Sequence, residues 1–229
     1  MNFKRILSVL WAILTVIGCV KTAVAQLHTM THAHDVHCVT FSDDGRLMAT
    51  GSLHNERTQE HPGDDELRAL VLKRGGDEQQ AERLTKRGGE INLWDVASGN
   101  LLRTLHGHTD CVCAVDFSPD GRTLATANAI LFGVRGRDRS CEVKLWDVAT
   151  GKARTTLTGH PDSVRSIAFS RDGKRLASAS HDGTVIIWNV AEAKPLFRFD
   201  VQCDAVWKLA YFPDGKLLAI AEQRGSITF

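Results

Sequence analysis

The stretch GHPDSVRSIAFSRDGKRLASASHDGTVIIWNV, residues 159–190, shows the pattern that decides the fold. Apolar and polar residues alternate from Val164 onward, a turn ends in Asp172-Gly173, and a second alternating run follows. Such alternation is typical of β-strands, and Asp-Gly between two runs favours a hairpin because glycine accepts the positive φ of the turn. A third apolar run, which ends at Trp188, predicts one more strand.

The same pattern occurs four times along the chain. The four segments align without gaps and begin at Val36, Val112, Val164 and Val206. Their turn glycines are Gly45, Gly121, Gly173 and Gly215, so the spacings are 76, 52 and 42 residues. A unit of 42 residues leaves 34 extra residues in the first repeat and 10 in the second. The tryptophan positions place both insertions between the second and third strands, at about 53–89 and 129–141.

Short motifs within the repeats carry a family resemblance. Gly-His and Trp-Asp pairs recur at Gly107-His108, Gly159-His160, Trp94-Asp95 and Trp146-Asp147. Together with the 42-residue unit, these pairs make residues 27–229 resemble the WD-repeat family of β-propellers. The resemblance implies an all-β fold, a β-propeller of WD-repeat type with four blades, in which each innermost strand lines a central channel. The repeats run over about 26–99, 100–151, 152–193 and 194–229.

The resemblance also implies a buried hydrogen-bonded network that holds each blade together. Its members are a His, a strand Ser or Thr, a turn Asp and the Trp. The third repeat supplies His160, Ser178 or Ser180, Asp182 and Trp188. In the first two repeats the insertions hide the Asp, and the other matches are His32, His108, Trp94 and Trp146. The fourth repeat has Cys203 and Phe229 in place of His and Trp.

Partner contacts in the resembled family come from the rim, where the inner strands begin. Carried over to this chain, the contact positions are His37, Cys113, Arg165 and Trp207, then Asp35, Cys111, Ser163 and Ala205, and finally His181. Trp207 and Arg165 are the strongest candidate anchors, because Trp and Arg dominate the energetics of protein interfaces.

The number of repeats does not decide whether the blades close into a ring. A seven-bladed ring would need roughly 280 to 315 residues. Three architectures remain: an open arc from a partial propeller, half of an eight-bladed ring built from two chains, and a tight four-bladed closure. An open arc has unpaired strand edges, which favour homo-oligomers.

Charge and motifs narrow the function. A net charge of +1 gives no reason to expect nucleic acid as a partner. The sequence has no GxSxG, HExxH or phosphate-binding glycine loop, so we expect no enzyme and no cofactor. The function that remains is a non-catalytic scaffold that presents a propeller rim to a protein or peptide. The insertions are either charged surface loops or part of that partner surface.

Two alternatives to a scaffold stay open. One is a fragment without independent function. The other is a metal-binding or enzymatic propeller that uses the N-terminal cluster His28, His32, His34, His37 and Cys38. Imidazole and thiolate suit zinc or copper, but an extended strand points neighbouring side chains to opposite faces, and no CxxC spacing occurs. We therefore predict no metal site.

The cysteines raise a separate question. Cys111 and Cys113 point the same way on a predicted strand, and a disulfide between them would be strained. Cys38 and Cys113, on inner strands of adjacent blades, are an alternative pair. Five cysteines follow Cys19, so an oxidising compartment would leave one of them unpaired or bonded to another chain.

Residues 1–25 have the composition of a targeting segment. Two basic residues precede an apolar run over 6–20, and Ala23-Val24-Ala25 resembles a cleavage site for signal peptidase. We expect an exported protein of bacterial type, in the periplasm or another extracytoplasmic location. Lipidation at Cys19 and an uncleaved membrane anchor are the alternatives to cleavage after Ala25.

Overall fold

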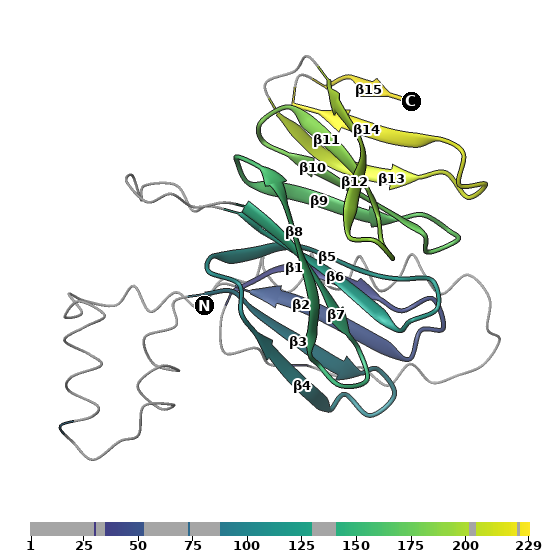
Figure 1. Ribbon diagram of the computed structural model, residues 1–229. Coiled ribbons are helices and arrows are strands. Elements are labelled where there is room, and N and C mark those ends of the chain that lie inside the picture. Colours follow the sequence, from purple (N-terminus) through teal and green to yellow (C-terminus); the bar gives the residue numbers. More distant parts are fainter. Residues whose placement is uncertain are drawn as a thin grey trace.

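The computed structural model describes residues 30, 35–52, 73, 88–129, 141–201, 205–223 and 225–229. Three four-stranded sheets and one three-stranded sheet, all antiparallel, follow one another along this part of the chain (Figure 1). The first contains β1 (Val36–Phe41), β2 (Leu47–Ser52), β3 (Glu90–Asp95) and β4 (Leu101–His106). The second contains β5 (Cys111–Phe117), β6 (Thr123–Ala129), β7 (Cys141–Asp147) and β8 (Ala153–His160). The third contains β9 (Val164–Phe169), β10 (Arg175–Ser180), β11 (Thr184–Asn189) and β12 (Lys194–Asp200), and the last β13 (Val206–Tyr211), β14 (Leu218–Glu222) and β15 (Ile227–Thr228).

The hairpin turns have the geometry that the Asp-Gly pairs predict. In the third sheet, Gly173 has a φ of 68° and its amide donates to the Ser170 carbonyl at 2.8 Å. The Ser170 hydroxyl donates to Asp172 Oδ1 at 2.6 Å, which fixes the turn from within. The equivalent glycines all have φ near this value, at Gly45, Gly121 and Gly215.

Successive sheets pack face to face. The inner strands β1, β5, β9 and β13 lie next to one another in chain order (Figure 1). The hydrophobic clusters join residues of successive sheets. The cluster between the first two sheets includes Ile91, Val112 and Trp146. Strands β2 and β5 approach each other so closely there that a Cβ on Gly51 would lie 2.5 Å from Val112 Cγ1. A single sheet cannot bury both of its faces, so the stacking supplies the core.

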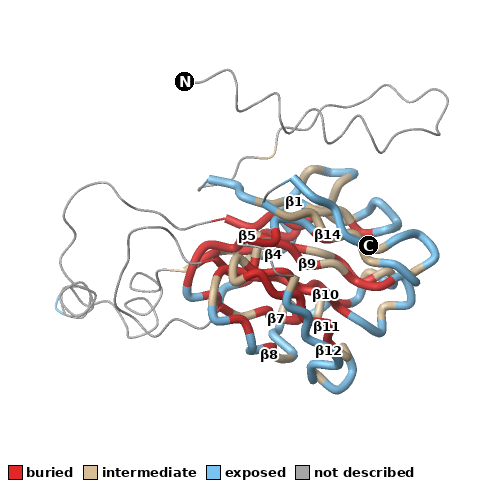
Figure 2. Tube along the Cα trace, turned by 90° about the horizontal axis from the view of Figure 1, so that it is seen from above, coloured by how far each residue is buried: buried red, intermediate tan, exposed pale blue. Residues whose placement is uncertain are grey.

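The sheets form blades of an open arc. In Figure 2 the buried residues concentrate on strands in the middle of the series, such as β5, β9 and β10, whereas the outer strand β12 is exposed throughout. At the two ends of the series, apolar residues remain exposed on the first sheet, at Val36 and Val39, and on the last, at Ile227. The predicted all-β fold, a WD-type open or partial propeller, is confirmed.

Several predictions concern residues outside the described part of the chain. They include the targeting segment, His28, His32, His34 and Cys203, and nearly all of both insertions. Among the described residues, no helix is long and apolar enough to cross a membrane.

Candidate functional site

The third blade is held together by a network around one serine hydroxyl. Trp188 Nε1 donates to Ser178 Oγ at 2.8 Å, and His160 Nε2 lies 2.7 Å from the same oxygen. On the other side of the ring, His160 Nδ1 lies 3.4 Å from Asp182 Oδ2 and 3.2 Å from Thr184 Oγ1. The structure thus selects Ser178 over Ser180, which donates instead to the Asp162 carbonyl at 3.0 Å.

Burial disfavours the charged form of the histidine in this network. Burial lowers the pKa of His160, and the Asp182 carboxylate opposes that effect. With its proton on Nδ1, the ring donates toward Asp182 and accepts from the Ser178 hydroxyl. Ser178 Oγ in turn accepts the indole N–H, so one tautomer provides a partner for both ring nitrogens of His160 and for the indole of Trp188.

The second blade has the same network with different residues. Trp146 Nε1 donates to Thr126 Oγ1 at 2.7 Å, and His108 Nε2 lies 2.6 Å from that oxygen. Glu142 takes the place of the aspartate, with Oε1 3.4 Å from His108 Nδ1 but without hydrogen-bond alignment. Lys144 Nζ lies 3.1 Å from the other oxygen of Glu142.

Sequence reasoning did not find Glu142, although a signal existed. Glu142 precedes Trp146 by four residues, and Thr184 precedes Trp188 by the same distance. The two side chains therefore start from equivalent positions beside the histidine. In the first blade, Trp94 Nε1 donates to Thr50 Oγ1 at 3.0 Å, while the predicted His32 lies outside the described residues.

A different group of side chains lies on the rim between the third and fourth blades. We call Asp162, Arg165, His181 and Trp207 the rim cluster. The Arg165 guanidinium carbon lies 5.6 Å from the centre of the Trp207 ring, and His181 meets that ring edge-on at 6.4 Å. His181 Nδ1 is 3.5 Å from Asp162 Oδ2. Trp207 is 45% exposed although it lies among these neighbours.

The backbone beneath the rim cluster is fixed by hydrogen bonds. The His181 amide donates to the Ser163 carbonyl at 2.9 Å, and the Ser163 amide donates to Asp162 Oδ1 at 2.6 Å. Arg165 Nε is buried and has no hydrogen-bond partner among the residues that the structure describes. The cluster therefore combines an exposed indole, a cation over its face and an imidazole at its edge.

The remaining predicted contact residues separate into two groups. Asp35 and His37 are exposed at the start of β1, and Cys113 is partly exposed on β5. Cys111, Ser163 and Ala205 are buried, so their side chains do not lie on the rim surface. Cys111 begins β5, whereas Ser163 and Ala205 immediately precede β9 and β13.

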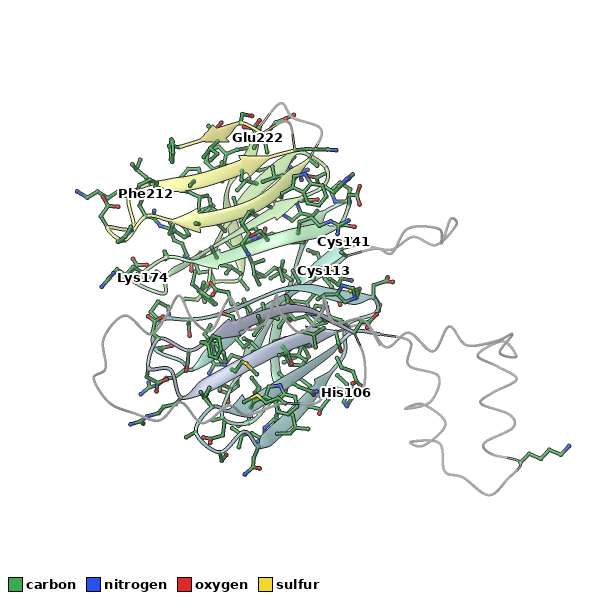
Figure 3. The ribbon with its side chains drawn as sticks, turned by 180° about the vertical axis from the view of Figure 1, so that it is seen from behind. His106, Cys113, Cys141, Lys174, Phe212 and Glu222 are labelled. Atoms are coloured by element: carbon green, nitrogen blue, oxygen red, sulfur yellow. The ribbon has the colours of Figure 1, made fainter. Side chains whose placement is uncertain are left out.

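Three thiols lie near the boundary between the first two blades. Cys111 and Cys113 have their Sγ atoms 3.4 Å apart, and Cys38 Sγ donates to the Val112 carbonyl at 3.4 Å. Burial raises the pKa of the Cys38 thiol. All the described cysteines are free thiols, at Cys38, Cys111, Cys113 and Cys141 (two of them labelled in Figure 3).

The N-terminal histidine cluster is only partly visible. His37 and Cys38 are the members that the structure describes. Within the described ranges, no group of three or more His, Cys, Asp or Glu side chains is arranged to hold a metal ion.

Comparison with known proteins gives matches over much of the chain. The family of the WD domain, G-beta repeat, matches residues 25–55, 99–147 and 151–189. Autophagy-related protein 16 of Arabidopsis thaliana is 31% identical over 122 residues, which are 39% of this chain and 24% of that protein. Nuclear distribution protein PAC1 of Arthroderma otae is 42% identical over 95 residues, 41% of this chain and 20% of that protein. Protein tipD of Dictyostelium discoideum is 29% identical over 155 residues, which are 67% of this chain and 18% of that protein. The chain thus spans about a quarter or less of the length of these eukaryotic relatives.

Proposed function

Because the chain belongs to the WD40 repeat family, we propose that it is a non-catalytic scaffold that binds a protein or peptide at the rim of its propeller arc. WD40 proteins are typically protein-interaction scaffolds. A fold alone does not assign a function, so the proposal depends on the surface that this chain presents.

The observation that carries the proposal is the rim cluster. An indole that is 45% exposed while its neighbours are held by hydrogen bonds is a preorganised apolar contact surface. Arg165 adds donors for a carbonyl or carboxylate oxygen beside that surface. The occupant that fits is a protein segment that places an apolar side chain against Trp207 and an acceptor oxygen near Arg165.

Substitution of the two anchors tests the site. Trp207→Ala combined with Arg165→Ala should weaken partner capture at least tenfold, since each anchor of this kind contributes about 2 kcal/mol or more. Thermal stability should change little, because Trp207 is 45% exposed and Arg165 Nε has no hydrogen bond among the described residues to lose. Pull-down with quantitative mass spectrometry measures the capture, and the melting temperature measures the stability.

A matched control separates the rim from general stickiness. Phe197→Ala removes an aromatic ring that is 58% exposed on the outer strand β12, away from the rim cluster. This variant should keep the wild-type capture profile. A double variant that also keeps the wild-type profile would exclude the rim cluster as the binding site.

Export is a separate proposal, supported by the composition of residues 1–25. Expression in a bacterial host with fractionation, followed by N-terminal sequencing, distinguishes the forms. A mature chain that begins at Gln26 supports cleavage, one that begins at a lipidated Cys19 supports an anchor, and an intact cytoplasmic chain rejects export.

A further inference from the structure

Two thiols on β5 lie closer together than a regular strand would bring them. Cys111 and Cys113 are separated by one residue, and their Sγ atoms are 3.4 Å apart. The pairing of β5 with β6 shifts register between Val112 and Ala114, so Cys113 lies at an irregularity of the strand. A disulfide has an S–S length of about 2.05 Å, so the sulfurs must approach by roughly a further 1.4 Å to bond.

The two thiols differ in their access to solvent. Cys111 is 0% exposed, whereas Cys113, labelled in Figure 3, is partly exposed. A reagent from solvent can therefore reach Cys113 but not Cys111. Cys111 can therefore react with a group that is already bound to Cys113, whose Sγ lies 3.4 Å away.

The surroundings also separate their chemistry. The hydrogen bond shared with Cys111 and the nearby positive charge of Arg165 lower the pKa of Cys113 against the effect of burial. The same hydrogen bond, together with burial, raises the pKa of Cys111. A thiolate is the nucleophile in thiol chemistry, so Cys113 is the more reactive member of the pair.

We propose that Cys111 and Cys113 form a thiol–disulfide exchange site for small disulfides, in which Cys113 attacks and Cys111 resolves. The Cys113 thiolate attacks a disulfide RS–SR, forms a Cys113–SR bond and releases RS⁻. Cys111 then loses its proton and attacks Cys113 Sγ, which forms the Cys111–Cys113 bond and releases a second RS⁻. The dithiol is oxidised by two electrons and RS–SR is reduced to two thiols, which balances the reaction. The strain of so small a ring makes the product easy to reduce, so the step is reversible.

Treatment of the reduced full-length protein with oxidised glutathione tests the proposal. Mass spectrometry of the tryptic peptide 104–122 should show the loss of two hydrogen atoms and no stable adduct. Cys111→Ala should instead accumulate a glutathione adduct on Cys113, because no resolving thiol remains. Cys113→Ser should leave Cys111 unmodified.

A control variant and a measurement on the wild type complete the test, and the second does not depend on the folding of any variant. Cys141→Ala, which removes another buried thiol, should behave as the wild type. In the native wild type, iodoacetamide should alkylate Cys113 several-fold faster than Cys38. Preferential modification of Cys38, or a wild-type peptide that carries a lasting adduct instead of a disulfide, would overturn the assignment. Neither readout depends on a partner at the rim.

Discussion

At the scale of single residues, the second and third blades each depend on one hydroxyl. Ser178 in the third blade and Thr126 in the second accept an indole N–H and lie within hydrogen-bonding distance of a histidine. The partners of these hydroxyls are buried, so removal of the hydroxyl leaves two polar atoms without a substitute. An unsatisfied buried polar group costs about 1 to 3 kcal/mol.

Ser178→Ala should therefore lower the free energy of unfolding by about 2 to 4 kcal/mol. The loss comes from the unpaired Trp188 Nε1 and His160 Nε2. Urea denaturation followed by tryptophan fluorescence measures it.

Ser178→Thr is the matched control, because threonine occupies the equivalent position in the first and second blades, at Thr50 and Thr126. It keeps the hydroxyl and should cost less than half as much as Ser178→Ala. Equal losses for the two variants would show that the hydroxyl network does not stabilise the blade.

At the scale of elements, neighbouring inner strands are joined by side chains as well as by packing. The Phe169 amide on β9 donates to Asp116 Oδ2 on β5 at 2.7 Å, and the Leu209 amide on β13 donates to Ser166 Oγ on β9 at 3.0 Å. Burial raises the pKa of Asp116 to about 6, against the opposing effects of the Phe169 amide and the charge of Lys208, while Asp43 adds to the increase. The junction of the second and third blades therefore carries a group that titrates near neutral pH.

This shift makes the stability depend on pH. The folded state favours protonated Asp116, so its stabilising effect is complete below a pH of about 3.8 and is lost as the pH rises through about 6. Between pH 4 and 7 the wild type should lose up to about 3 kcal/mol of unfolding free energy relative to Asp116→Asn. The amide oxygen of the asparagine can still accept the Phe169 N–H. Denaturant titrations at several pH values measure the difference.

Asp214→Asn provides the control, because Asp214 is an exposed residue in a turn. This variant should track the wild type across the same pH range. A wild type and an Asp116→Asn protein with parallel pH profiles would show that Asp116 is not the titrating group.

At the scale of the whole molecule, the arc has two ends that differ from its middle. The inner blades bury both faces, whereas Val36 and Val39 on the first sheet, and Ile227 and Phe229 on the last, stay exposed. Exposed apolar residues beside unpaired strand edges promote association.

We expect the purified chain to associate as its concentration rises, and Ile227→Lys to shift the mass toward that of a single chain. The charge disfavours burial of the last sheet against another surface. Light scattering coupled to size exclusion measures the mass. Leu102→Lys changes a residue of similar exposure on the outer strand β4 and should leave the association unchanged. A wild type that stays monomeric at every concentration would reject the homo-oligomer.

Much of the fold was predictable because its signals are local. Alternation and the Asp-Gly turns specify each hairpin over a few residues, and the glycines have the positive φ that the pattern required. The site was predictable only in part. Trp207, Arg165 and His181 come together as the rim cluster, but Cys111 and Ser163 are buried. Burial depends on the neighbouring blade, which a strand pattern does not describe.

The sequence by itself thus determined the strands, the turns, the repeat unit and the residue types of the blade network. The tertiary structure decided which residues complete that network, such as Glu142 beside His108, and which thiols meet on β5. The reason is physical. Hydrogen bonding within a hairpin depends on residues near in sequence, whereas side-chain partners and solvent access depend on distances between blades that are set by packing.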